Sequence, residues 1–228
     1  MSIDDPILWA ALLKIIGVNI VLSGDNAVVI ALAARSLPEK QQKQAIFWGS
    51  AAAIVMRIVL TLFAVALLQL NWLKLVGSVL LLWIGVKLLV PEDEEEDINA
   101  SDNLFQAIKT ILIADLVMSL DNVIAVAAAA EGHWGLMITG LAISIPLVIF
   151  GATLLVKVME RFPVVVTIGA ALIGWVAGEM AWDDGGIHAF TSQYPNYMKY
   201  VAGLAGAILV VVLGKYLGGR AQRSQAAA

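Results

Sequence analysis

The 228-residue chain contains no cysteine, only two histidines, and few charged residues, which make up 14% of the total. The absence of cysteine excludes disulfides, thiolate-zinc sites and thiol nucleophiles. His133 and His188 both fall outside the long apolar runs, which argues against an imidazole-rich zinc or copper site in a membrane. No nucleophile with its base is recognisable, so we predict no enzyme. The net charge of −4 and the lack of a basic stripe exclude nucleic acid as a predicted partner.

Hydrophobic residues, by contrast, form 61% of the chain, whereas about 45–50% is usual for a soluble domain. Seven apolar runs are each long enough to cross a bilayer. We therefore predict an all-α membrane protein with seven transmembrane helices in a single domain, 1–228, surrounded by lipid. The predicted spans are 7–34, 44–70, 72–90, 104–130, 134–158, 164–182 and 198–217.

The basic residues near the span ends predict the orientation, because cytoplasmic loops are richer in Lys and Arg. One side has only two of them, Lys74 and Lys199. That side is therefore predicted to be outside, together with the N-terminus, and the C-terminus is predicted to be cytoplasmic. The acidic run 92–97 then lies in a cytoplasmic loop, 91–103. The richer side collects Arg35, Lys40, Lys43, Lys157, Arg161, Lys215, Arg220 and Arg223.

The chain also repeats itself. The segment Ser23-Gly24-Asp25-Asn26 matches Ser119-Leu120-Asp121-Asn122, and a further polar residue stands six positions before each aspartate. Three spans lie in each copy, and an odd number makes the copies enter the membrane from opposite sides. We predict two inverted three-helix repeats, about 7–90 and 104–182, with an extra helix at 198–217. Secondary transporters commonly have this architecture, with their sites where the repeats meet.

The alignment of the two copies pairs further positions. Asn19 in the first repeat corresponds to Asp115 in the second. In the third and sixth spans Gly77 corresponds to Gly169. Arg57 in the second span has no charged counterpart, since Val148 aligns with it.

Three carboxylates, those of Asp25, Asp115 and Asp121, lie inside apolar runs. An ionised carboxylate there is costly unless it is paired, hydrated or bound to metal. Carboxylate and amide oxygens suit hard cations such as Mg²⁺, Ca²⁺ or Mn²⁺. The alternative is that these carboxylates only hold helices together. The candidate metal ligands are Asp25, Asn26, Asp115, Asp121, Asn122 and Asn19, with Ser23 and Ser119 as weaker candidates.

Other polar residues in the spans have two interpretations each. Arg57 either neutralises the site when the ion is absent or forms a structural pair with one carboxylate. Lys87 either assists the site or extends to the nearby interface. Glu179 is either an exit ligand or an interfacial carboxylate. Gly24 favours a local helix break beside Asp25, which would add carbonyl ligands.

The Ser-Gly-Asp-Asn-Ala-Val-Val-Ile-Ala segment at 23–31 and the pattern Asp115-x5-Asp121-Asn122, in a seven-span frame, resemble the TerC family, named for tellurium resistance. The resemblance is strongest to its short, riboswitch-associated YjbE-type branch. It implies a seven-helix fold related to the LysE transporter superfamily, a bacterial inner-membrane location and export of Mn²⁺. It also implies that the family's metal-associated acidic positions correspond here to Asp25, Asp115 and Asp121.

The resulting hypothesis is an exporter of Mn²⁺ working by alternating access, with no prosthetic group and Mn²⁺ as the transported ion. Carboxylates vacated by the metal could take up protons, which makes metal/proton antiport reasonable. Two rivals remain: a non-transporting membrane scaffold for stress-response partners, and an exporter of a small organic cation or amino acid. The sequence leaves the oligomeric state open, a homo-oligomer included.

Overall fold

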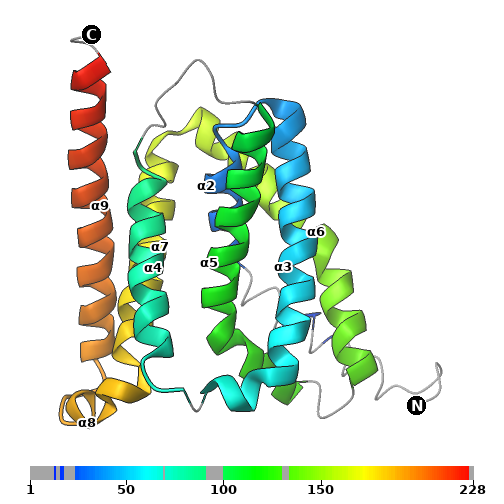
Figure 1. Cartoon of the computed structure of the whole chain (residues 1–228), viewed down its shortest axis with the longest axis vertical. Coiled ribbons are helices and arrows are strands. Elements are labelled where there is room, and N and C mark those ends of the chain that lie inside the picture. Colours follow the sequence, from blue (N-terminus) through cyan, green and yellow to red (C-terminus); the bar gives the residue numbers. More distant parts are fainter. Residues whose placement is uncertain are drawn as a thin grey trace.

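A computed structural model describes residues 13, 16–17, 24–68, 70–90, 100–129 and 134–225, and Figure 1 gives their arrangement. These residues form helices and turns with no strand, which confirms the predicted all-α class. The helices run roughly along one common direction, and α9 lies at one edge of the bundle. The elements are α2 (Gly24–Ala34), α3 (Glu39–Leu68), α4 (Leu73–Lys87), α5 (Ala100–Ala129), α6 (Trp134–Arg161), α7 (Val164–Trp182), η1 (Gly185–Ile187), α8 (His188–Thr191) and α9 (Met198–Gln225).

Five helices of the described part, namely α3, α5, α6, α7 and α9, are long and apolar enough to cross a membrane. The other two predicted spans are shorter in the structure. Helix α4 has 15 residues, or about 22 Å at 1.5 Å per residue, which is less than the roughly 30 Å hydrocarbon core. Helix α2 has 11 residues, and most of the predicted first span before it lies outside the described residues. The count of seven spans therefore stays a prediction.

The outer surface of the bundle carries large apolar side chains. Phe63, Phe105 and Phe150 are among the exposed ones. A soluble protein rarely exposes contiguous apolar surface of this extent, whereas lipid tails solvate it well. The buried core is made of smaller aliphatic residues contributed by α2 to α7.

The packing partners of the helices follow a regular scheme. Helix α3 packs on α5, and α2 packs on α6. Helix α2 also contacts α7, and α4 contacts α5. The remaining contacts between the two predicted repeats join α2 to α5, α3 to α6 and α4 to α7. Exchanging α2, α3 and α4 with α5, α6 and α7, respectively, leaves this set of contacts between the repeats unchanged.

The aligned glycines occupy matching contacts. A Cβ added at Gly77 of α4 would lie 2.8 Å from Cγ1 of Val117 on α5. A Cβ added at Gly169 of α7 would lie 2.9 Å from Cγ1 of Val28 on α2. In each case the third helix of one predicted repeat approaches the first helix of the other, and only glycine permits the approach.

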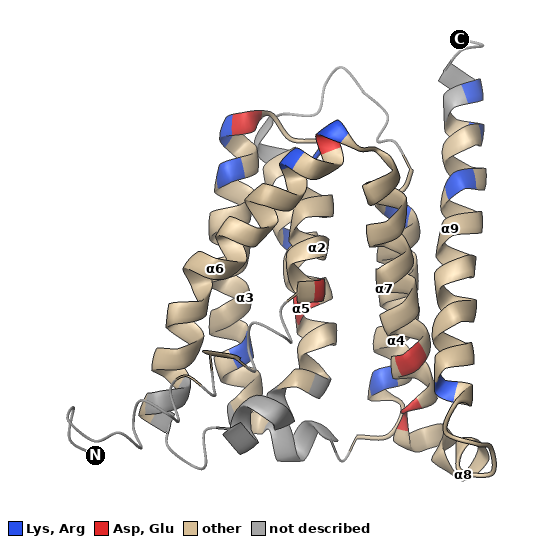
Figure 2. Ribbon diagram, turned by 180° about the vertical axis from the view of Figure 1, so that it is seen from behind, with Lys and Arg blue, Asp and Glu red and all other residues tan. Residues whose placement is uncertain are grey.

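The basic residues predicted to share one side of the membrane lie at one end of the bundle. Figure 2 shows Lys and Arg gathered at the end of the bundle where α9 finishes, with few at the end beside α8. At the basic end, Nη2 of Arg35 donates to the carbonyl oxygen of Leu88 at 2.9 Å, which joins the end of α2 to the end of α4. Lys199 forms an ion pair with Asp183 at the opposite end. The side of the membrane that each end faces remains a prediction.

Asp184 joins two loops at the end of the bundle beside α8. Its Oδ1 accepts from the backbone N–H of Trp72 at 3.0 Å and of Gly186 at 2.6 Å, and its Oδ2 accepts from Leu75 N–H at 2.9 Å. Trp72 adopts a left-handed conformation, with φ of 72°, before α4 begins. The side chain thus caps the turn into α4 from the far end of α7. The Asp-Gly-Gly sequence at 184–186 is the turn signal that could have revealed it.

We expect the Asp184→Asn variant to lose about 1–3 kcal/mol of unfolding free energy, because the amide cannot accept all three bonds. Burial alone would raise the pKa of Asp184, but bonds from Leu75, Gly186, Trp72 and Lys74 N–H outweigh it and lower the pKa. A lowered pKa stabilises the fold above the unfolded value and loses that contribution as the pH falls through the folded value. Thermal unfolding in detergent should separate variant and wild type at pH 7 and separate them less at an acidic pH below the usual aspartate range. An equal difference at both pH values would contradict this account.

Helices α7 and α9 meet through glycine at very short range. A Cβ added at Gly178 would lie 2.1 Å from the carbonyl oxygen of Ala202, and one at Gly174 would lie 2.5 Å from that of Gly206. Gly174 and Gly178, four residues apart, thus form the surface of α7 that packs on α9.

The Gly178→Ala variant should accordingly destabilise the protein by about 1–3 kcal/mol, since backbone atoms must separate to admit the methyl group. Gly219→Ala in α9 is the control, because a Cβ there meets nothing within 4 Å. Thermal unfolding of both variants in the same detergent provides the comparison. If the two variants were equally stable, α9 would not be held by this contact.

Candidate metal site

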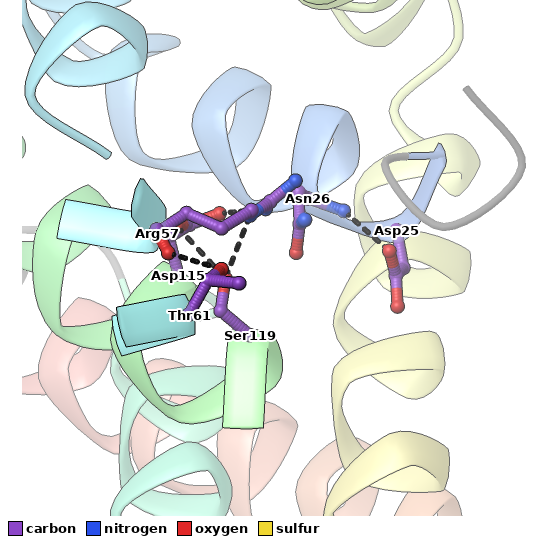
Figure 3. Close-up of polar contacts among 6 residues, drawn as sticks. All are labelled: Asp25, Asn26, Arg57, Thr61, Asp115 and Ser119. Carbon is purple, nitrogen blue, oxygen red and sulfur yellow. Dashed lines mark hydrogen bonds and ion pairs between the residues drawn. The ribbon is translucent and has the colours of Figure 1, made fainter. Parts of the chain in front are cut away.

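A buried polar cluster connects α3 and α5. Nη2 of Arg57 lies 2.6 Å from Oδ1 of Asp115, and the two side chains are 3% and 6% exposed. Nε of Arg57 donates to Oγ of Ser119 at 3.0 Å, and that hydroxyl donates to Oδ2 of Asp115 at 3.1 Å. Oγ1 of Thr61 donates to the backbone carbonyl of Arg57 at 2.7 Å. Arg57 thus pairs with one intramembrane carboxylate, that of Asp115 (Figure 3), and this pair agrees with both interpretations given for Arg57.

Asp25 and Asn26 lie beside this cluster, in the first turn of α2. The backbone N–H of Asn26 donates to Oδ1 of Asp25 at 2.8 Å. Asn26 is buried, and in the view of Figure 3 it lies between Asp25 and the Arg57–Asp115 pair. Asp25 is within electrostatic range of both members of that pair. The structure therefore brings residues of α2 and α5 together as the aligned motifs predict.

The face of α5 that carries the cluster continues along the helix. Asp115, Ser119 and Asn122 are spaced four and three residues apart, which places them on one side of a helix, and all three are buried. Asp121 belongs to the same helix, but its side chain lies outside the described part, as do Asn19 and Ser23 altogether. Helix α5 is continuous through Leu120 and Asp121. A helix break in the second copy is absent. Gly24, where the break in the first copy is predicted, is the first residue of α2, and the residues directly before it lie outside the described part, so that break stays a prediction.

Two auxiliary candidates lie elsewhere. Lys87 stands at the end of α4, with its Nζ 5.8 Å from the ring centroid of Trp83, and its side chain is exposed. That position agrees with the interpretation that it extends to the interface. Glu179 faces α9, since its Cγ would lie 3.1 Å from a Cβ added at Gly203. Neither residue is part of the cluster around Asp115.

Within the described ranges no group of three or more His, Cys, Asp or Glu side chains is placed to bind a metal. A metal ligand set here must therefore include amide oxygens or Asp121, whose side chain the structure leaves undescribed. Both oxygens of Asp115 already accept bonds from Arg57 and Ser119.

Two pockets touch α5 on either side of Asp115. One, of about 100 Å³, lies at the basic end among α2, α4 and α5, and reaches Thr110 on α5 and Ala33 on α2. The other, of about 190 Å³, lies at the opposite end beside Asp184 and reaches Leu120. Thr110 and Leu120 each stand five residues from Asp115, which is about 7.5 Å along a helix. Along the axis of α5, Asp115 therefore lies between the levels that these two pockets reach, and neither of the two is lined by Asp115, Arg57 or Asp25.

Long apolar helices, a lipid-compatible surface and buried polar residues define an integral, multi-pass membrane protein. Comparison with protein families then identifies the family: residues 4–222 match the integral membrane protein TerC family. The chain belongs to the TerC family, as its motifs predict. No solved structure matches the chain.

The relatives are bacterial membrane proteins. The chain is 44% identical over 184 residues to the uncharacterized membrane protein YjbE of Bacillus subtilis, covering 81% of this chain and 84% of that protein. It is 27% identical to the uncharacterized membrane protein YceF of the same organism, over 99% and 90% of the two chains. The UPF0053 inner membrane protein YgdQ of Escherichia coli is 28% identical, over 82% of this chain and 86% of its own length.

Proposed function

We propose that the protein transports a divalent metal ion, and specifically that it exports Mn²⁺ from the cytoplasm. The observation that carries the proposal is the polar constellation on α2 and α5, in which Asp25 and Asn26 lie beside Asp115 and Ser119 (Figure 3), with Asn122 buried further along α5. Ionisable residues buried in membrane helices commonly mark ion pathways. Hard oxygen donors without sulfur or imidazole favour a cation such as Mn²⁺ over soft metals.

In the proposed mechanism Asp25 and Asp121 hold the ion, with the amide oxygens of Asn26 and Asn122 and with Asn19 nearby. Each predicted repeat supplies one carboxylate and one amide of the paired Asp-Asn motifs. The choice of Mn²⁺ and the outward direction come from the family resemblance. Protons taken up by the vacated carboxylates would return in exchange for the metal.

Alternating access between inverted repeats gains support from two features. The contacts between the two predicted repeats form the same set of helix pairs when the repeats are exchanged, as a two-fold axis in the membrane plane requires. Two pockets at opposite ends of the bundle reach α5 at levels on either side of Asp115 along the helix axis. A transporter of this kind opens one pocket to the site while the other stays closed.

The test is Mn²⁺ flux into proteoliposomes that contain purified protein, followed with a metal-quenched dye inside the vesicles. We expect Mn²⁺-dependent quenching above that of protein-free vesicles, together with alkalinisation of the vesicle lumen if protons leave in exchange for the entering metal. A scaffold predicts no flux and no change of cellular manganese in a deletion strain. An organic-cation exporter predicts flux of labelled lysine or polyamine without Mn²⁺ flux.

A further inference from the structure

The contacts of Asp115 differ from those expected of a vacant metal ligand. Arg57 bonds one of its oxygens at 2.6 Å and Ser119 bonds the other at 3.1 Å. Arg57 is itself fixed, since its Nε donates to Ser119 and its backbone carbonyl accepts from Thr61. A metal at Asp115 would have to share a carboxylate whose two oxygens already accept bonds from Arg57 and Ser119, close to the positive charge of a guanidinium fixed by these contacts.

The two predicted repeats differ at just these positions, and they differ together. The second repeat supplies Asp115, and Arg57 faces it from α3 across the α3–α5 contact. The alignment puts Asn19 opposite Asp115 and Val148 opposite Arg57. The α3–α5 contact thus carries an acid and a base, whereas the alignment assigns two uncharged residues to the corresponding contact between the first and fifth predicted spans. Ser23 and Ser119 are the same in both copies, and so are the Asp-Asn pairs.

Charge balance agrees with this pairing. If Arg57 left Asp115 to make room for a metal, an unpaired guanidinium would remain buried beside a divalent cation, and such an arrangement is strongly unfavourable. If Arg57 stays, its charge and that of Asp115 cancel. The two charges of the metal are then matched by Asp25 and Asp121, one from each repeat.

On the basis of the proposed function, we propose that Asp115 is a positioning residue and not a metal ligand. It keeps Arg57 neutralised and fixes α3 against α5, so that the guanidinium does not repel the cation held by Asp25 and Asp121. Asn19 and Val148 are the uncharged residues that the alignment assigns to the corresponding contact between the first and fifth predicted spans. It follows that the charged pair can be replaced by the uncharged residues aligned with it, provided that both are replaced together.

The experiment measures KM and maximal rate for Mn²⁺ in proteoliposomes of the full chain. The variants are Asp115→Asn, Arg57→Val and the double variant with both changes. Asp115→Asn leaves the guanidinium uncompensated near Asp25, and we expect KM to rise by about tenfold or more through repulsion. The double variant should return KM to within about threefold of wild type. A ligand role for Asp115 predicts instead that the double variant is at least as impaired as Asp115→Asn.

Two controls keep the outcomes distinct. Arg57→Lys retains the positive charge and should keep KM near that of wild type, and thermal unfolding without metal identifies any variant that does not fold. If wild-type protein transports Mn²⁺ and the folded double variant is not rescued, the positioning role is wrong while the proposed function stands. If wild-type protein shows no flux of Mn²⁺, the proposed function fails and this inference fails with it.

Discussion

Replacing Asp25 or Asp121 with Asn should lower Mn²⁺ flux by at least about 100-fold, because metal sites lose about 10–100-fold even when outer-shell partners are removed. The amide has nearly the shape of the carboxylate but carries no charge. In Asp25→Asn the side-chain oxygen can still accept the N–H of Asn26, which Asp25 accepts at 2.8 Å. The fold should therefore persist while the cation loses a charged ligand. The measurement is the initial rate of flux in proteoliposomes with equal protein content.

Glu39→Gln provides the control for this pair of variants. Glu39 is an exposed carboxylate at the start of α3 that pairs with Lys43, and its loss should leave the flux unchanged. Undiminished flux in the double variant Asp25→Asn/Asp121→Asn would reject these residues as ligands. A loss of flux in Glu39→Gln as large as that in Asp25→Asn would also contradict the assignment, because it would point to a general effect of charge.

The second large effect concerns stability. Arg57→Met should lower the unfolding free energy by about 3–5 kcal/mol, because removing one member of a buried pair leaves an uncompensated charge. The carboxylate of Asp115 would keep only the hydroxyl of Ser119 among the bonds described for it. Thermal or denaturant unfolding in detergent, with chelator present, measures the loss without any contribution from metal binding.

Lys43→Met is the matched control, since it breaks an exposed ion pair at 2.7 Å on the same helix. Exposed pairs contribute about 1 kcal/mol or less. We therefore expect a much smaller change than in Arg57→Met. Similar losses in the two variants would mean that the Arg57–Asp115 pair is hydrated, contrary to the burial described for it.

Much of the architecture could be predicted from the sequence, because apolar run length and turn residues are local properties. The predicted span 164–182 coincides with α7, and α9 begins at Met198 as predicted. The basic residues at the loops predict which helix ends lie together, and the link from Arg35 to Leu88 agrees with them. The repeated motif predicts that residues of α2 and α5 meet, and the burial of Asn26 and Asn122 fits that meeting.

Other features depend on tertiary contacts that no local pattern contains. Arg57 needed a carboxylate partner, but three were available, and only the packing of α3 on α5 selects Asp115, 58 positions away. Glu179 lies in a predicted span and is a candidate exit ligand by sequence, yet in the structure it packs against α9 at Gly203. The role of Asp184 depends on the turn at Trp72, which is 112 positions away in the sequence. In each case the missing information is which helices become neighbours.

The most direct measurement is a structure determined after soaking with Mn²⁺, with anomalous scattering recorded at an energy where manganese contributes. We predict a peak between α2 and α5, within about 2.5 Å of carboxylate oxygens of Asp25 and Asp121, with Arg57 still bonded to Asp115. Manganese bound only at the acidic run 92–97, or a bundle interior without anomalous signal at saturating Mn²⁺, would contradict the proposed site.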